Sequence, residues 1–79
     1  MWSEGIIGVP ETGNNYKYWV KHYDEPSDVY GINGGKVSKC TIRKVGESRD
    51  LYNYDRGLDR DCENDEVRTV LAIVLNKYN

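Results

Sequence analysis

The most regular pattern in the sequence is an apolar stripe near the C-terminal end of the chain. Its members recur at intervals of three and four residues, and they are Val67, Val70, Leu71, Val74, Leu75 and Tyr78. This spacing predicts an amphipathic α-helix, because residues three and four apart share one helix face. Asn64 is the expected N-cap, and Asp65 and Glu66 suit the positive end of the helix dipole. A single helix with one apolar face must pack on a sheet, so the chain is predicted to be a two-layer α+β protein.

Four segments that precede the helix have the composition of β-strands. They are Trp2–Val9, Tyr16–Tyr23, Lys36–Val45 and Arg49–Tyr54. Turn-forming residues separate these segments, so consecutive strands are expected to pair antiparallel. The prediction is a single domain, residues 1–79, in which a four-stranded antiparallel sheet is packed by one C-terminal amphipathic helix (ββββα). The segment Asp55–Asp61 is expected to be a polar connection to the helix.

Side chains alternate between the two faces of a strand, so the pattern also predicts which residues face the helix. These are Ile6, Tyr18, Val20, Cys40 and Ile42. The fourth strand stays undecided, because Leu51 favours one face and the pair Tyr52 and Tyr54 favours the other. A register error of one residue would exchange the two sets.

The charge of the chain is small but unevenly distributed. A net charge of −2 excludes a protein that coats nucleic acid in general. Between Lys17 and Arg49 there are seven basic and four acidic residues, whereas between Asp50 and Glu66 there are two basic and seven acidic residues. This distribution predicts a basic sheet and an acidic turn before the helix.

The sequence predicts a cytoplasmic protein that does not contact a membrane. The N-terminal residues lack the basic segment of a secretory signal, and no apolar stretch is long enough to span a bilayer. The two cysteines, Cys40 and Cys62, are too few for a disulfide framework and lack the CxxC spacing of a structural zinc site. Both are therefore expected to be reduced and structural.

No group of residues in the sequence predicts catalysis, a bound metal or a cofactor. His22 is the only histidine, and no Ser, Cys or carboxylate stands at the spacing of a catalytic triad or metal site. Asp55, Asp59 and Asp61 do not fit a calcium-binding loop, so they are interpreted as solvated turn residues. The run Gly31–Lys36 does not fit the spacing of a nucleotide-binding P-loop, and it leads into a strand where that motif requires a helix.

A binding surface is predicted on the sheet face turned away from the helix. Aromatic rings flanked by cations, as in the segment Tyr16–Tyr23, bind nucleotides or single-stranded nucleic acid on many sheets. The alternative is a solvated face whose basic residues discourage aggregation. The glycine-rich loop before the third strand adds N–H groups that suit a phosphate or carboxylate, or else it is a turn that requires positive φ. The candidate binding residues are Lys17, Trp19, Lys21, Tyr23, Asn33, Gly34, Lys36, Lys39, Arg43 and Arg56.

Several short segments of the chain are shared with a known group of proteins. They are Trp2–Gly5, Lys21–Tyr23, Tyr30–Lys39 and Asn53–Gly57. Through them the chain resembles a family of uncharacterised short proteins of Gram-positive bacteria and their phages. The chain departs from this family at Leu58, where an aromatic residue is expected, and at Cys40, where leucine is expected. Both differences are interpreted as variation in packing.

The resemblance implies a setting, because small phage proteins outside replication and the virion often block host defence. The implied function is a non-catalytic counter-defence protein that binds a host defence protein, as an anti-CRISPR-type inhibitor does, or sequesters a nucleotide signal. The first alternative is a structural or regulatory accessory protein that acts as a homo-oligomer through Ile73 or an open sheet edge. The second is a hydrolase or nucleic-acid-modifying enzyme that uses His22 and Asp55.

Overall fold

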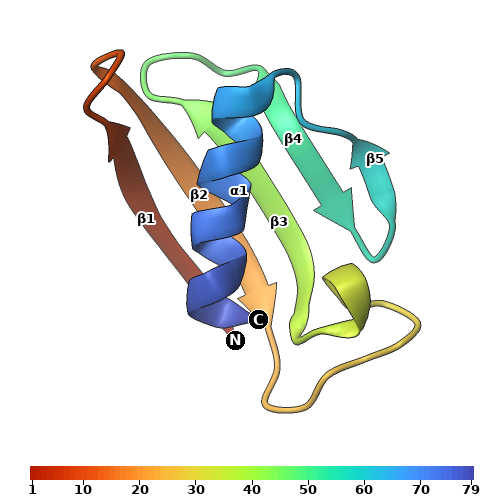
Figure 1. Cartoon of the computed structure of the whole chain (residues 1–79). Coiled ribbons are helices and arrows are strands. Elements are labelled where there is room, and N and C mark those ends of the chain that lie inside the picture. Colours follow the sequence, from red (N-terminus) through yellow and green to blue (C-terminus); the bar gives the residue numbers. More distant parts are fainter.

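The computed structural model describes all 79 residues and has an antiparallel sheet with one long helix across it (Figure 1). The sheet has five strands in the order β1-β2-β3-β4-β5, so each strand pairs with the next along the chain. The strands are β1 (Trp2–Val9), β2 (Asn14–His22), β3 (Val37–Lys44), β4 (Asp50–Asp55) and β5 (Leu58–Arg60). The helices are α1 (Asp65–Tyr78) and a short 3-10 helix, η1 (Ile32–Gly34), between β2 and β3. The predicted α+β class and the C-terminal helix are confirmed.

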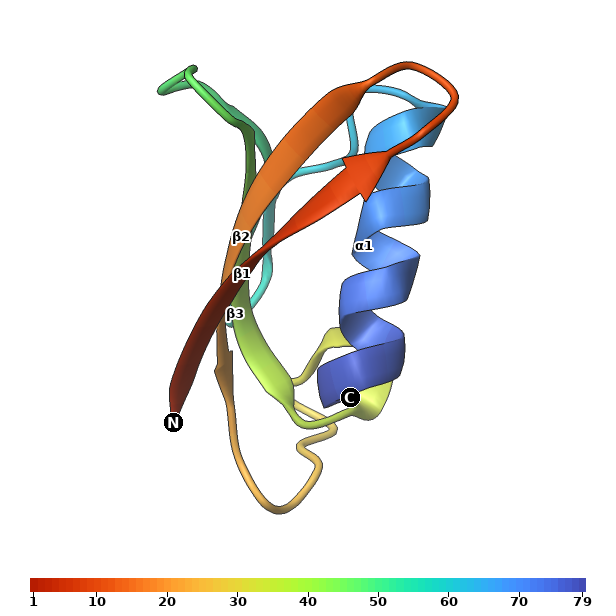
Figure 2. The same ribbon diagram turned by 90° about the vertical axis from the view of Figure 1, so that its left-hand side faces the viewer.

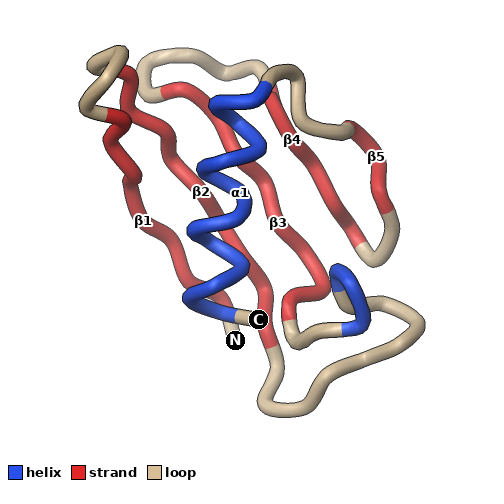
Figure 3. Tube along the Cα trace, viewed as in Figure 1, coloured by secondary structure: helices blue, strands red, loops and turns tan.

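The prediction of four strands is wrong, because part of the expected polar connection forms the fifth strand. After β4 the chain reverses at Arg56, whose φ of 57° is in the left-handed region, and Asp55 N donates a hydrogen bond of 2.9 Å to Gly57 O. The chain then pairs with β4 as β5, which Figure 3 shows at one edge of the sheet. All three residues of β5 are exposed. An exposed strand carries no alternation of apolar and polar residues, so hydrophobicity could not reveal it.

The helix forms where the apolar stripe predicts it. Asn64 is the N-cap, and its Oδ1 accepts a hydrogen bond of 3.0 Å from Val67 N. Val67, Val70 and Val74 are buried against the sheet, and the other members of the stripe are partly buried. Helix α1 has 14 residues, and no helix of the structure is long and apolar enough to cross a bilayer.

The core lies between α1 and the sheet face that it covers. The predicted core residues Tyr18, Val20, Cys40 and Ile42 are all buried there. The prediction for Ile6 is wrong, since its side chain is 62% exposed. The register explains the difference: Ile6 lies opposite Lys17 on the far face, whereas Ile7 lies opposite Tyr16 and packs against the core.

The fourth strand buries residues of both sets that the sequence left undecided, whereas Tyr54 is only partly buried. Tyr52 lies opposite Ile42, but Arg43 lies opposite Asp50, so Leu51 is an extra residue in a β-bulge. A bulge bends the strand and redirects the side chain of the inserted residue. Tyr52 and Leu51 are therefore both buried, although they are adjacent in the sequence.

Glu66 joins the first turn of α1 to the β1–β2 hairpin. Its Oε1 accepts hydrogen bonds from Thr12 Oγ1 at 2.9 Å, Asn14 Nδ2 at 3.0 Å and Tyr16 OH at 2.8 Å. These hydrogen bonds favour the charged carboxylate and hold the pKa of Glu66 below its ordinary value. The carboxylate therefore stabilises the folded chain through contacts between segments distant in the sequence.

We expect Glu66→Gln to reduce the pH dependence of stability. A lowered pKa contributes stability above the pKa of the unfolded carboxyl group, and that contribution is lost as the pH falls through the lower pKa of the folded chain. The wild-type melting temperature should therefore fall more than that of Glu66→Gln between neutral pH and about pH 3, as measured by circular dichroism. Glu11→Gln, an exposed change in the same hairpin, is the control and should behave as the wild type. Equal losses in Glu66→Gln and wild type would contradict this role.

Candidate binding face

The sheet face opposite α1 is covered by no other element of the chain (Figure 2). We call it the outer face, and it is formed by Trp2, Glu4, Ile6, Lys17, Trp19, Lys21, Lys39, Thr41, Arg43, Asp50, Asn53 and Asp55. Strands β2 and β3 pair antiparallel, with Lys21 opposite Lys39 and Lys17 opposite Arg43. The structure therefore brings together five of the predicted binding residues, which are Lys17, Trp19, Lys21, Lys39 and Arg43. Tyr23 follows β2, and its ring lies 5.6 Å from Lys21 Nζ.

Two tryptophans form a shallow hollow on the outer face. Trp2, Trp19, Thr41 and Arg43 line this hollow, which has a volume of about 260 Å³. Lys17 Nζ lies 5.0 Å from the centre of the Trp19 ring, and Arg43 Cζ lies 5.4 Å from it. Cations at these distances are attracted to the face of an aromatic ring. The hollow is thus an aromatic surface with cations beside it, and Trp2 is 58% exposed there.

Trp2 is not among the binding residues predicted from the sequence. It lies on the outer face because β1 pairs with β2 in a register that places Trp2 opposite Lys21. Alternation along the first strand places Trp2 and Ile6 on the same face of the sheet. The prediction that Ile6 faces the helix therefore kept Trp2 out of the predicted binding face.

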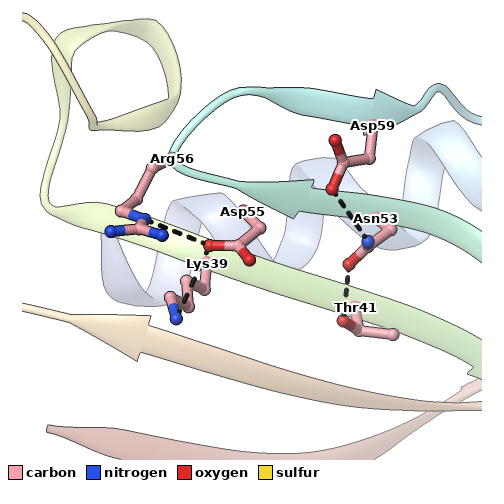
Figure 4. Close-up of polar contacts among 6 residues, drawn as sticks. All are labelled: Lys39, Thr41, Asn53, Asp55, Arg56 and Asp59. Carbon is pink, nitrogen blue, oxygen red and sulfur yellow. Dashed lines mark hydrogen bonds and ion pairs between the residues drawn. The ribbon is translucent and has the colours of Figure 1, made fainter.

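Acidic residues of β4 lie on the same face and pair with two of the predicted cations. Arg43 Nε lies 2.6 Å from Asp50 Oδ1, and Lys39 Nζ lies 3.5 Å from Asp55 Oδ1. Arg56 Nε also lies 3.3 Å from Asp55 Oδ1. Figure 4 draws Asp55 between Lys39 and Arg56. The predicted separation of a basic sheet from an acidic turn is therefore wrong, because β4 brings its carboxylates to the sheet.

A polar chain continues this arrangement towards the edge strand β5. Thr41 Oγ1 donates a hydrogen bond of 2.9 Å to Asn53 Oδ1, and Asn53 Nδ2 donates one of 3.3 Å to Asp59 Oδ2 (Figure 4). The β3–β5 half of the outer face is thus occupied by internal ion pairs and hydrogen bonds. Lys17 and Lys21 on β2 form no ion pair, so the free positive charge lies beside Trp2 and Trp19.

Comparison with known proteins identifies the family. The model of a domain of unknown function, DUF7678, matches residues 1–79. The chain belongs to this family. This DUF7678 chain matches no curated protein and no solved structure. The family match agrees with the predicted resemblance to an uncharacterised group of short proteins.

The glycine-rich loop of the DUF7678 domain lies on the helix side of the sheet (Figure 2). Asn79, the last residue, holds it there, because Asn79 Nδ2 donates to Ile32 O at 3.1 Å and Asn79 Oδ1 accepts from Val37 N at 3.0 Å. Asn33 and Gly34 have positive φ values of 53° and 71°, which agrees with the interpretation of this run as a turn. The structure therefore does not bring Asn33 and Gly34 to the outer face.

The glycine-rich loop ends at Lys36, which is exposed and directly precedes β3. Gly31 is required for space, since a Cβ at this position would overlap the carbonyl group of Gly35. The loop is packed closely on itself, and Ser27 N donates a hydrogen bond of 3.0 Å to Gly35 O. The backbone N–H groups of Gly31, Gly34 and Gly35 likewise donate to carbonyl groups within the loop.

His22 lies on the helix side of the DUF7678 domain and has structural partners. Its Nε2 is 2.9 Å from Ser3 Oγ, and its ring centre is 5.0 Å from that of Tyr78. The thiols of Cys40 and Cys62 are both free. Burial raises the pKa of Cys40 to about 12, so this thiol is not a nucleophile at neutral pH.

The largest hollow of the domain, about 560 Å³, lies beside the N-terminal end of α1. Four of the six charged residues that line it have internal partners, and only Lys44 and Glu47 have none. Arg49 Nη1 is 2.7 Å from Glu63 Oε1, and Glu66 binds the hairpin as described above. We assign the candidate site to the smaller hollow between Trp2 and Trp19, where an exposed ring, a partly buried ring and the unpaired Lys17 lie together.

Proposed function

We propose that this domain is a non-catalytic binding protein that attaches to a partner protein through its outer face. The observation that carries the proposal is the hollow between the exposed ring of Trp2 and the partly buried ring of Trp19. Arg43 contacts the Trp19 ring there and forms an ion pair with Asp50. Tryptophan, tyrosine and arginine contribute most of the binding energy at protein interfaces. A face that mixes aromatic rings with charges of both signs suits a protein surface better than a polyanion, which requires an excess of cations.

We infer the biological setting from the family resemblance. Small phage proteins that block host defence act by covering a working surface of an effector protein, and this requires no catalytic group. The proposed role is therefore that of an anti-CRISPR-type inhibitor in the cytoplasm of a bacterial host. The outer face would cover the effector, while α1 and the core hold that face in shape.

A nucleotide signal is the second candidate ligand, and one observation favours it. Lys17 and Lys21 have no carboxylate partner and stand beside Trp19 and Tyr23, with Lys17 Nζ 5.0 Å from the Trp19 ring. An aromatic ring can stack on a base while adjacent lysines contact phosphates. In this case the domain would sequester the messenger of a defence system.

One capture experiment tests both candidates. The immobilised chain is exposed to lysate of a Gram-positive bacterium, and mass spectrometry identifies the bound proteins and nucleotides. Wild type and Ile73→Ala should retain a common protein that Trp19→Ala loses, because Ile73 is exposed on α1, far from the outer face. Retention of a nucleotide alone, lost in Trp19→Ala, would support the second candidate. Equal retention by all three chains would contradict the outer face as the site.

A further inference from the structure

The two edges of the sheet differ in how they are protected. The edge strand β5 has only three residues, and two of them, Asp59 and Arg60, are charged. The other edge strand, β1, has eight residues and one charge, at Glu4. Figure 2 looks onto β1, and no element of the chain covers its free side. Charged or short edge strands resist pairing with another chain, whereas long uncharged ones invite it.

The pairing of β1 with β2 shows which backbone groups are free. Met1 and His22 exchange two hydrogen bonds, from Met1 N to His22 O at 3.0 Å and from His22 N to Met1 O at 2.9 Å. Hydrogen-bonded and non-hydrogen-bonded pairs alternate along an antiparallel ladder. Because the register from Trp2 to Val9 is continuous, the residues whose N–H and C=O groups point to the free edge are Trp2, Glu4, Ile6 and Gly8.

We propose that β1 pairs antiparallel with β1 of a second copy of this chain, around a twofold axis at Gly5. In this register Trp2 lies opposite Gly8 and Glu4 lies opposite Ile6, so all four free residues form hydrogen-bonded pairs. A shift of the register by two residues in one direction would place Glu4 opposite Glu4 of the second copy. A shift by two residues in the other direction would place Trp2 opposite Pro10, which has no N–H to donate.

The side chains on the outer face fit this register. The Trp2 ring would lie over Gly8 of the second copy, where no side chain competes for space. Glu4 is the only charge on β1, and it would face Ile6 of the second copy, beside which Lys17 stands. A carboxylate of each copy thus approaches a lysine of the other. The result is one continuous sheet with both helices on the same side and both outer faces on the other.

The edge pairing of β1 is separate from the proposed contact with a partner protein, and variants at Ile6 test it without changing Trp19. Ile6 is 62% exposed, so its replacement leaves the core intact. In the proposed register residue 6 faces Glu4 of the second copy. We therefore expect Ile6→Lys to self-associate at least about tenfold more tightly than Ile6→Glu. A dimer formed by general apolar contact would be weakened equally by both changes.

Sedimentation equilibrium over a range of concentrations is the measurement. The wild-type mass should rise from 9.1 kDa towards twice that value. Ile6→Pro should stay monomeric, because proline removes an N–H at the free edge but none from the ladder with β2. Circular dichroism checks that Ile6→Pro folds. If it does not, the difference in self-association between Ile6→Lys and Ile6→Glu tests the edge pairing.

Three results would overturn the inference. They are a wild type that is monomeric at the highest attainable concentration, a dimer that persists in a folded Ile6→Pro, and equal association of the Lys and Glu variants. Loss of the dimer in Ile6→Glu together with its retention in Trp19→Ala would support the edge pairing separately from the proposed function. Loss of partner capture in Trp19→Ala, with the dimer unchanged, would be a result about the outer face and not about the pairing of β1.

Discussion

Trp19→Ala is expected to weaken partner binding by at least about 2 kcal/mol, or roughly thirtyfold in Kd. Trp19 lies on the outer face beside the facing pair Lys17 and Arg43, and its ring forms one wall of the hollow. Removal of the ring would leave the facing groups of the partner without contact. The measurement is isothermal titration calorimetry with the protein identified by capture.

The fold should tolerate this substitution, because Trp19 points away from α1 and is not part of the buried core. The melting temperature of Trp19→Ala should stay close to that of the wild type. Ile73→Ala, which changes an exposed apolar residue on the helix, is the matched control and should bind as the wild type does. An unchanged Kd in Trp19→Ala would remove the hollow from the proposed site.

Ile42→Ala is expected to destabilise the domain by about 2–5 kcal/mol. Ile42 is fully buried on β3, between Tyr18 on β2 and Tyr52 on β4. Alanine would leave a cavity at the centre of the interface with α1. A domain of this size has a total stability of roughly 5–10 kcal/mol, so the variant would retain little margin. Urea unfolding followed by circular dichroism gives the value.

The neighbouring residue supplies a control from the opposite face of the same strand. Thr41 points to the outer face, where its hydroxyl group donates to Asn53 Oδ1. Thr41→Val keeps the shape of the side chain and removes this partly exposed hydrogen bond, which contributes about 1 kcal/mol at most. A cost for Ile42→Ala no larger than that for Thr41→Val would mean that the assignment of the two faces is incorrect.

The parts of the fold that rest on periodic burial were predictable from the sequence. The stripe of α1 and the alternation of β2 and β3 each reflect one buried face, so the helix and the positions of Lys17 and Trp19 on the outer face followed from spacing. Strand β5 was not predictable, because its formation depends on the left-handed turn at Arg56 and on hydrogen bonds with β4. Such determinants carry no hydrophobic signal.

The electrostatics of the candidate site were less predictable than its residues. The pairing of Arg43 with Asp50 depends on a bulge that removes Leu51 from the ladder, and no local pattern indicates that bulge. The position of the glycine-rich loop depends on Asn79, which is distant in the sequence. The face therefore carries its free positive charge on Lys17 and Lys21 alone, instead of across two strands.

Tryptophan fluorescence tests the central claim most directly, because the only two tryptophans, Trp2 and Trp19, both lie on the outer face. Acrylamide quenching should be measured for the free chain and for the chain saturated with its captured partner. If the partner covers the outer face, the emission should shift to shorter wavelength and quenching should decrease. Saturated binding with unchanged emission and unchanged quenching would show that the partner binds elsewhere, and would contradict the proposed site.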